Sequence, residues 1–247
     1  MNIFASLYLK FSKNRFSRTF KPLGIKKKRN FLISAPSDVS DFLKTLPFIE
    51  GLKKLGNIVI LMPKNLENIY RYMKPKIFET IFYEKPSQLF SKEYRRLKEK
   101  LNNKSFHFLI ELNRPANISL PYLASTEKRI CFYEKNSFPY YNIMIKHSIN
   151  SLEQFFNIKS SNPQNLFHFY ARDLKKTLKK FNKKKPLLFI NGENDITWEG
   201  DKIVVGTDIL SSDPEVYKIL YFSDAYHGQC DALYEFVKIF DKRIVKS

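Results

Sequence analysis

The stretch Asn30–Gly56, NFLISAPSDVSDFLKTLPFIEGLKKLG, decides the fold of this chain. It opens with the apolar run Phe31–Ile33, which predicts a buried strand, and then breaks at a polar turn. From Phe42 to Leu55 the apolar residues recur at steps of three and four, the period of an amphipathic helix. Gly56 is expected to close this helix in the left-handed conformation. A strand, a tight polar turn and a helix form the unit that aims a helix N-terminus at an anionic ligand.

Three side chains that can act on a ligand crowd the turn: Asp38, Ser40 and Asp41. Residues of these types most often cap the helix that they precede. They also suit a loop that faces a substrate. Both interpretations stay open on the residues of the turn alone.

The composition of the 247 residues bounds the class of protein. A hydrophobic content of 43% and an aromatic content of 15% are sufficient for a packed core and exclude general disorder. The net charge of +19 favours an anionic partner such as nucleic acid, anionic lipid or a phosphorylated ligand. Cys131 and Cys230 have no CxxC partner, which argues against a disulfide framework or a zinc site and suits a reducing compartment.

Residues 1–29 form a basic amphipathic arm with nine basic side chains and no acidic one. Its first part predicts a helix over residues 2–12 whose apolar stripe consists of Ile3, Phe4, Leu7, Tyr8 and Phe11. An apolar stripe beside basic residues suits an in-plane anchor in an anionic membrane. The alternative is a helix packed on the protein itself, followed by a solvated linker. No apolar run is long enough for a transmembrane helix, and no cleaved signal is predicted.

Beyond the arm, predicted strands alternate with predicted helices. Such alternation predicts a parallel sheet with helices on both faces, whose ligand lies beyond the carboxyl ends of the strands. The strands are expected at residues 57–63, 77–83, 106–112 and 129–133, and the helices at 66–73, 88–101 and 116–124.

Residues 137–161 predict a long helix, continuous or interrupted, that ends at the hinge Ser160–Pro163. We therefore expect an N-terminal domain at 30–160 and a small α/β domain at 161–247. The second domain is expected to hold two or three strands. Its predicted elements are a basic helix at 171–181, strands at 186–191, 203–206 and 243–245, and helices at 214–221 and 231–240.

Several motifs of known chemistry are absent from the sequence. Neither GxGxxG nor GxxxxGK[ST] occurs, which disfavours Rossmann-type oxidoreduction and P-loop phosphoryl transfer. There is no GxSxG, so a nucleophile-elbow hydrolase has no support. The histidines never pair at metal-ligand spacing; His107, inside a predicted strand, suggests a structural role, and His227 is expected on a loop before a helix. The basic helix lacks interleaved aromatic residues, so no nucleic acid is expected as a partner.

The residues around Asp41 resemble the N-terminal pattern of family-9 glycosyltransferases, the ADP-heptose:lipopolysaccharide heptosyltransferase group. That family has an apolar strand, a polar loop, Gly-Asp, three residues and a Thr-x-Pro-like step into a helix. Here the same order ends in Asp41, Thr45 and Pro47, with Ser40 in place of the family's glycine. Residues 108–114 and 129–132 resemble a later segment of strand, Asp, loop, helix and RIGF, in which the family's Asp falls near Glu111.

The resemblance implies an α/β protein of the GT-B fold with two Rossmann-like parallel-sheet units, the second reduced. It implies an inverting, metal-independent transfer in which Asp41 is the general base, with no cofactor. An ADP-sugar would be the donor and a cell-envelope glycolipid the acceptor, as in lipopolysaccharide biosynthesis. The protein would be cytoplasmic and peripheral on the inner membrane. The implied acceptor-side residues are Ser37, Asp38, Ser40, Asn113 and Arg114, and the donor-side candidates are Asn191, Gly192, Asp224 and His227.

The C-terminal part departs from the family. Asp224–His227 matches the family's Asp-x-Gly-x-x-His signature only in part. About a third of the domain that the family's pattern leads us to expect is missing. An alternative is therefore a catalytically inactive relative that acts as a membrane-associated binding or scaffold protein. An RNA-binding module is a third reading, which predicts binding with a steep salt dependence.

Overall fold

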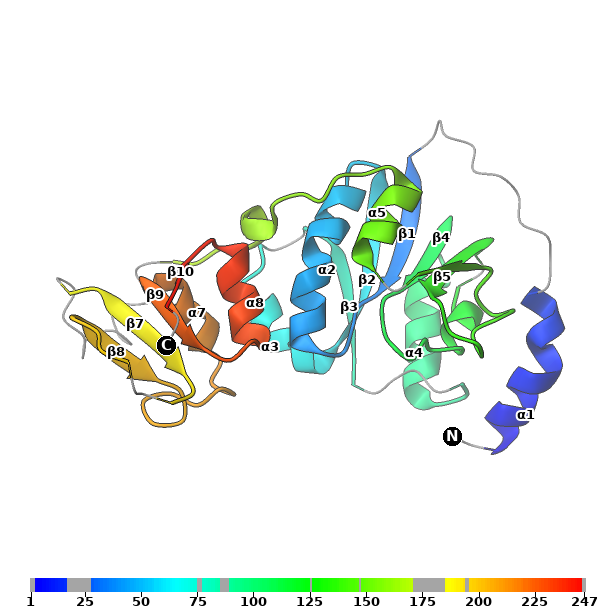
Figure 1. The fold of residues 1–247 in the computed structure, drawn as a ribbon. Coiled ribbons are helices and arrows are strands. Elements are labelled where there is room, and N and C mark those ends of the chain that lie inside the picture. Colours follow the sequence, from blue (N-terminus) through cyan, green and yellow to red (C-terminus); the bar gives the residue numbers. More distant parts are fainter. Residues whose placement is uncertain are drawn as a thin grey trace. The chain divides into compact units, whose positions relative to one another are not determined.

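A computed structural model describes residues 3–16, 28–74, 77–84, 89–124, 126–146, 148–170, 185–193 and 196–245. The chain divides into two compact units (Figure 1). The first comprises residues 1–38, 45–66 and 75–161, and the second comprises 39–44, 67–74 and 162–247.

The first unit is built on a six-stranded sheet in which every neighbouring pair is parallel. The strand order is β3-β2-β1-β4-β5-β6, the doubly wound order of dinucleotide-binding folds. The order reverses between β1 and β4, and the carboxyl ends of those two strands form the topological switch point. The strands are β1 (Arg29–Ser34), β2 (Gly56–Pro63), β3 (Glu79–Tyr83), β4 (Phe108–Glu111), β5 (Lys128–Phe132) and β6 (Ile143–Ile145).

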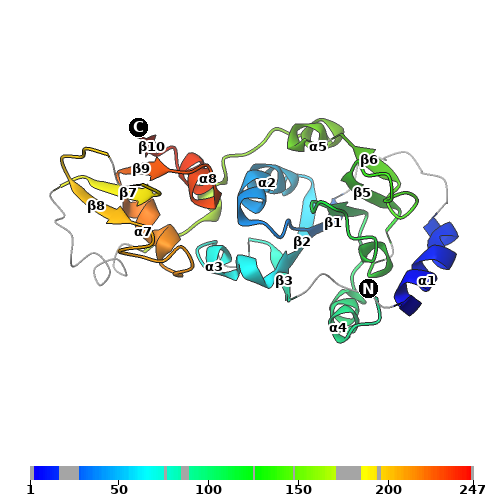
Figure 2. The same cartoon turned by 60° about the horizontal axis from the view of Figure 1, so that its bottom comes forward.

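Helices cover both faces of this sheet (Figure 2). On one face α5 (Ile149–Phe156) brings the Phe156 ring to 5.8 Å from Phe31 and 5.2 Å from Phe108, centroid to centroid. On the other face α4 (Lys92–Leu101) buries its apolar residues against the alternate side chains of β1 and β2. The predicted α/β class with a parallel sheet is confirmed. The remaining elements up to residue 122 are α1 (Ile3–Ser12), η1 (Lys13–Phe16), α2 (Val39–Leu52), η2 (Lys64–Leu66), α3 (Glu67–Tyr70) and η3 (Leu120–Tyr122). Of these, α3 and the first six residues of α2 are assigned to the second unit.

Gly56 does not close a helix in the left-handed conformation, so that expectation is wrong. α2 ends at Leu52, and Gly56 is the first residue of β2, where it pairs with Arg29. A Cβ atom on Gly56 would lie 1.8 Å from the Arg29 carbonyl oxygen. The glycine is therefore required by the close approach of two strands.

Of the long helix expected over residues 137–161, only α5 is present, so the expectation is wrong for the first part of this segment. Turns occupy its first part, which contains Pro139, a residue without the N–H that a helix interior needs. Ile143–Ile145 then forms β6, and α5 follows. The Asn142 Oδ1 accepts a hydrogen bond of 2.9 Å from the Arg129 N–H, which places the chain beside β5. The helix expected at 116–124 is reduced to η3, and His107 precedes β4 instead of lying within it.

The second unit has a four-stranded parallel sheet of order β10-β9-β7-β8, one strand more than the upper expectation. Leu188, Ile190 and Ala225 form the buried centre of one of its faces. The helix α8 (Ala232–Ile239) is capped at its N-terminus by Asp231, whose Oδ1 accepts a hydrogen bond of 2.8 Å from the Leu233 N–H. The elements are η4 (Pro163–Leu166), β7 (Leu187–Asn191), β8 (Asp201–Val204), α7 (Val216–Phe222), β9 (Ala225–Gly228), α8 and β10 (Arg243–Ile244). The basic helix expected at 171–181 lies outside the described residues.

We expect Gly56→Ala to lower the free energy of unfolding by about 2 kcal/mol, because the new methyl group meets backbone that cannot move aside. Gly51→Ala is the matched control: in α2 its Cβ would lie 3.1 Å from the Lys159 carbonyl oxygen, and alanine gains about 1 kcal/mol of helix propensity. Urea unfolding followed by circular dichroism compares the two variants. Equal stability of both would contradict the assignment of Gly56.

Candidate functional site

The candidate site of the first unit lies at its switch point. Ser34 ends β1 and is in register with Glu111, which ends β4. The loop after β1 carries Ser37 and Asp38, and the loop after β4 carries Asn113 and Arg114. Sheets of this kind bind ligands beyond the carboxyl ends of their strands, where the order reverses. The two loops that hold the predicted acceptor-side residues therefore meet at one place.

The side chain of Asn113 ties these two loops together. Its Oδ1 accepts a hydrogen bond of 2.9 Å from the Ser37 N–H. Its Nδ2 donates to the Ala35 carbonyl at 2.8 Å, to Glu111 Oε1 at 2.8 Å and to Ser34 Oγ at 3.2 Å. These contacts use the hydrogen-bonding capacity of the amide. Asn113 is thus placed to position the loop after β1 and has little capacity left for a ligand.

The loop after β1 is also held from the β2 side. Asn65, in the segment that follows β2, donates from Nδ2 to the Ser37 carbonyl at 2.6 Å. The N–H and the carbonyl of Ser37 are therefore both engaged by side-chain amides, while the residue itself is exposed. A loop fixed in this way presents the Ser37 hydroxyl at a defined position.

Glu111 lies beneath the loops and is 1% exposed. Its Oε1 accepts hydrogen bonds from the Asn113 N–H at 2.9 Å and from Asn113 Nδ2 at 2.8 Å. Its Oε2 lies 3.4 Å from the Tyr141 hydroxyl, which donates to the Asn117 carbonyl at 2.8 Å. Burial raises the pKa of Glu111 to about 7, although the hydrogen bonds from Asn113 act to lower it. Burial beside the same carboxyl also raises the pKa of Tyr141.

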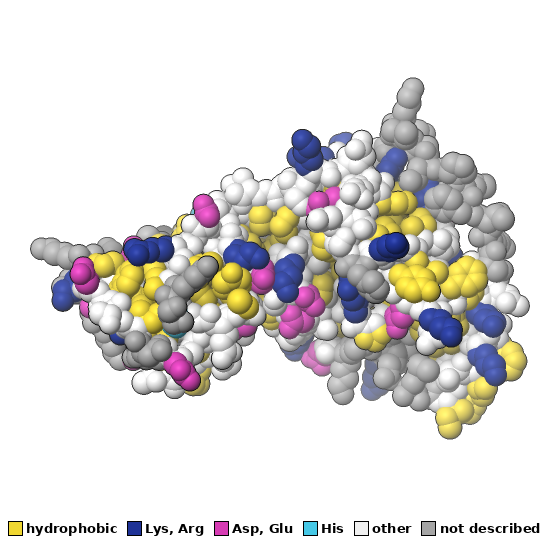
Figure 3. Space-filling view, in the orientation of Figure 1, with side chains coloured by type: hydrophobic (Ala, Val, Ile, Leu, Met, Phe, Trp, Pro, Cys, Tyr) yellow, Lys and Arg dark blue, Asp and Glu magenta, His cyan; other side chains and the backbone are white. Residues whose placement is uncertain are grey.

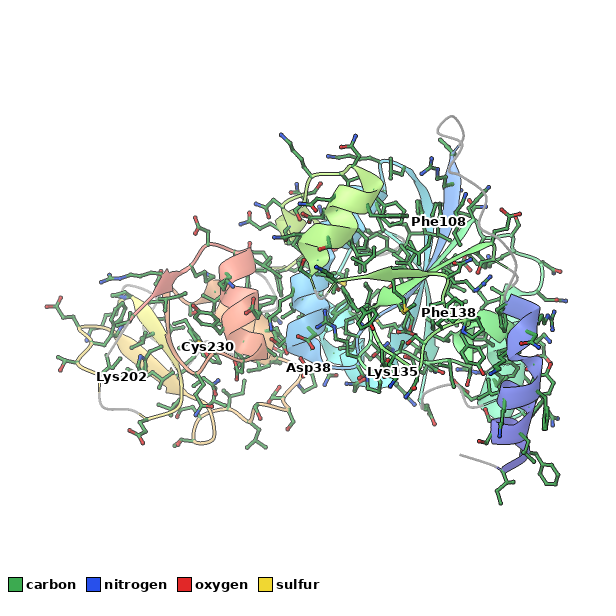
Figure 4. All side chains as sticks on the ribbon, turned by 45° about the vertical axis from the view of Figure 1, so that its right-hand side comes forward. Asp38, Phe108, Lys135, Phe138, Lys202 and Cys230 are labelled. Atoms are coloured by element: carbon green, nitrogen blue, oxygen red, sulfur yellow. The ribbon has the colours of Figure 1, made fainter. Side chains whose placement is uncertain are left out.

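Two exposed acidic groups lie on the loop after β1 and in the first turn of α2. Asp38 lies just before α2 (Figure 4), and Asp41 is in its first turn. The Asp41 side chain is 64% exposed, and its Oδ1 lies 3.4 Å from Lys44 Nζ. Ser40, next to it, is half-buried. A solvated carboxylate in this place can accept a proton from a hydroxyl group that binds close to it.

Arg114 contributes an exposed cation at the end of β4. Its guanidinium carbon lies 4.1 Å from the centre of the Phe132 ring, at the end of β5. The aromatic face holds the guanidinium while its N–H groups stay available to an anion. Of the predicted acceptor-side residues, Ser37, Asp38 and Arg114 are exposed.

The second unit brings two of the donor-side candidates together. Asn191 ends β7, and Gly192 follows it with a φ of +143°, a conformation that favours glycine. Asn191 Nδ2 donates to Asp231 Oδ2 at 2.7 Å, and Asp231 caps α8. A Cβ atom on Gly228, which ends β9, would lie 2.2 Å from the Asn191 carbonyl oxygen. Neither Asp231 nor Gly228 was predicted as a residue of the site. For Asp231 a signal was present, because an Asp directly before an apolar run is a recognisable helix cap.

Asp224 lies at the opposite end of the same sheet. Its Oδ2 accepts a hydrogen bond of 2.7 Å from the N–H of Leu187, the first residue of β7. His227 was expected on a loop, and this is wrong because Ala225–Gly228 pairs with β7 as a strand. The His227 Nδ1 lies 3.1 Å from the Val245 carbonyl oxygen. Asp224 and His227 are thus engaged by backbone groups of the second unit.

Two further features bear on the kind of site. Among the residues that the structure describes, no group of three His, Cys, Asp or Glu side chains gathers closely enough to hold a metal ion. Within the same described ranges, no helix has the length and apolar character that crossing a membrane requires.

The fold is shared with solved glycosyltransferases. A family-9 glycosyltransferase from Veillonella parvula superposes with a TM-score of 0.68 and 13% identity over 92% of this chain and 82% of its own. The E. coli heptosyltransferase WaaC with ADP-2-deoxy-2-fluoro heptose gives a TM-score of 0.56 and 12% identity, over 87% of each chain. WaaC with ADP gives a TM-score of 0.53 and 14% identity, over 87% of this chain and 86% of that one. No protein-family model matches the chain, and no curated protein matches it in sequence.

The likeness extends across both units and identifies the architecture. The two parallel sheets, of six and four strands, match the GT-B-like architecture of these glycosyltransferases, and the second unit is the smaller. At 12% to 14% identity, the likeness concerns the fold. Function depends on the residues of the site and does not follow from the fold.

The raised pKa of Glu111 gives a pH dependence of stability with a defined sign. The folded protein holds the proton up to a pH of about 7, whereas the unfolded carboxyl releases it near 4.5. Stability is then greatest below the lower value and falls as the pH rises to 7, by an amount on the order of 3 kcal/mol. We expect Glu111→Gln, which stays neutral and can donate to Tyr141, to remove this loss.

Urea unfolding between pH 4.5 and 8 measures the effect. The variant should match the wild type at low pH and exceed its stability at pH 8. Glu127→Gln, at an exposed position of the same unit, serves as the control and should follow the wild type. A stability difference between the wild type and Glu111→Gln that stays constant over this interval would contradict the assignment.

Proposed function

We propose that this chain is a glycosyltransferase that transfers a heptose-like sugar from a nucleotide-diphosphate donor to a glycolipid of the cell envelope. The observation that carries the proposal is the exposed carboxylate of Asp41, in the first turn of the helix that follows the switch-point loop. A shared fold with the heptosyltransferase WaaC, over 87% of this chain, supports the reaction class.

Asp41 is proposed as the general base. A hydroxyl oxygen of the acceptor attacks the anomeric carbon of the donor sugar, and its proton passes to the Asp41 carboxylate. The bond between the anomeric carbon and the diphosphate oxygen breaks, and the nucleoside diphosphate leaves with its electron pair. Attack on the side opposite to the leaving group inverts the anomeric centre. An exposed carboxylate suits this role because a hydroxyl group of a bound acceptor can reach it.

The acceptor is proposed to contact the loop after β1 and the loop after β4. The Ser37 hydroxyl, Asp38 and Ser40 can hydrogen-bond to sugar hydroxyls, and Arg114 can pair with an anionic group of the acceptor. Asn113 acts in this proposal by positioning the Ser37 backbone. A glycolipid acceptor places the reaction at the cytoplasmic face of the inner membrane, with the protein bound peripherally.

The donor is proposed to be an ADP-sugar, because the solved WaaC structures contain ADP or an ADP-heptose analogue. Asn191 and Gly192 are the residues of the second unit that best support donor binding, since they end a parallel strand at its carboxyl end. Asp224 and His227 enter the proposal only as residues that support this sheet. Basic side chains and backbone N–H groups would stabilise the departing diphosphate without a metal ion.

We expect Asp41→Asn to reduce sugar transfer at least a hundredfold, since general-base catalysis contributes 10²–10⁴-fold in rate. The change removes the proton acceptor and keeps the shape of the side chain. Calorimetric titration with ADP should give the same affinity for variant and wild type. Glu67→Gln, which changes a half-buried acid of α3, is the control and should keep wild-type transfer.

The reaction is followed with ADP-heptose and a lipopolysaccharide-precursor acceptor, with release of ADP as the readout. Wild-type transfer by Asp41→Asn would disprove the role of this residue. The alternative, an inactive relative that acts as a membrane-associated scaffold, predicts no saturable heat with ADP or ADP-sugars at millimolar concentration.

A further inference from the structure

The helix α1 has two apolar faces: the inner one is buried, and the outer one is largely exposed among the described residues. Ala5 and Leu9, on the inner face, are 1% and 2% exposed. They join the core cluster of α4 and the central strands. The inner face of α1 is therefore part of the first unit.

Hydrogen bonds fix this helix in one orientation. The Tyr140 hydroxyl donates to the Leu9 carbonyl at 2.7 Å. The buried Arg129 donates from its guanidinium to the Phe16 carbonyl at 3.3 Å, and its guanidinium carbon lies 4.9 Å from the centre of the Phe16 ring. Since both ends of the segment 9–16 are attached, the direction of the outer face is set by the fold.

The outer face consists of large apolar side chains that remain exposed. Ile3 is 75% exposed, Leu7 46% and Phe11 77%. At roughly 100° per residue they lie within one stripe of the helix, together with Phe4 and Tyr8. Phe90 continues the stripe, with its ring centre 5.3 Å from that of Tyr8. Figure 3 shows hydrophobic side chains gathered along α1 at the lower right, with Lys and Arg side chains beside them.

The charged side chains of the arm itself are all basic. Lys10, Lys13 and Arg15 lie on α1 and the 3₁₀ turn that follows it. Residues 1–29 contain nine basic side chains and no acidic one. An apolar stripe beside basic residues complements a membrane surface, where lipid tails contact the stripe and anionic headgroups pair with the cations.

We propose that the outer face of α1 is a docking surface for membranes that contain anionic lipids, with α1 lying in the plane of the interface. Because α1 is already folded against the first unit, the cost of ordering an amphipathic helix at the membrane is small. The rigid attachment through Tyr140 and Arg129 also gives the first unit one orientation on the bilayer. This inference deepens the peripheral location proposed above, and its test needs no transferase activity.

The full chain is tested by co-sedimentation with vesicles of phosphatidylcholine alone and of phosphatidylcholine with phosphatidylglycerol. We expect binding to the anionic vesicles that weakens as salt is raised, and at least tenfold weaker binding to the neutral ones. Ile3→Ser combined with Phe11→Ser should lower the partition coefficient about a hundredfold, at about tenfold for each large side chain.

Leu210→Ser is the matched control, since Leu210 is 64% exposed in the second unit and should not affect binding. Circular dichroism verifies that each variant is folded. Failure of the wild type to bind anionic vesicles, or equal binding by the double variant, would overturn the inference. A dimer in sedimentation velocity that the double variant turns into a monomer would overturn it as well, since the face would then bind a second copy. ADP titration of the same samples measures donor binding independently of vesicles. A failure to bind membranes can therefore be distinguished from a failure of the transferase proposal.

Discussion

The candidate site depends on the hydrogen bonds of one side-chain amide, that of Asn113. Where β1 and β4 end, their chains diverge, and the backbone groups that follow lose the partners that the sheet supplied. The amide replaces these partners on both sides, since it accepts from the Ser37 N–H and donates to the Ala35 carbonyl. The loop that leads into α2 is thereby held in one conformation. The direction in which this loop presents its exposed side chains follows from that attachment.

The Asn113 amide is in turn hydrogen-bonded to a buried acid, Glu111. Glu111 receives hydrogen bonds from both nitrogens of Asn113 and is closed off from water by the sheet and Tyr141. A full charge there would be costly, so the environment raises the pKa and favours the neutral form. Asp41, at the solvated start of α2, has the opposite environment. The two carboxyl groups are thus suited to different tasks: the buried one supports the loop, and the exposed one is proposed to exchange a proton.

The sequence was sufficient for features that depend on local periodicity. The strand at Phe31–Ile33, the helix after it and the alternation of the later elements follow from apolar spacing, and the structure confirms them. Features that depend on neighbours distant in sequence were not predictable in this way. β6 exists because Asn142 and Ile143–Ile145 find partners on β5, whereas their own spacing suited a helix. His227 belongs to a strand because β7 lies beside it, and Gly56 is set by the backbone of Arg29. Glu111 lies near the position of an Asp in the family that the sequence resembles, but its burial under Asn113 could be found only in the three-dimensional arrangement.

The central claim is that Asn113 holds the loop after β1 in place. Hydrogen exchange at the Ser37 amide tests it most directly, because the Asn113 Oδ1 is the acceptor of that N–H. The measurement compares the wild type with Asn113→Ala under conditions in which both are folded. The account predicts that exchange at Ser37 becomes at least tenfold faster in the variant, while amides of β2 keep their protection. Unchanged protection of Ser37 would contradict it.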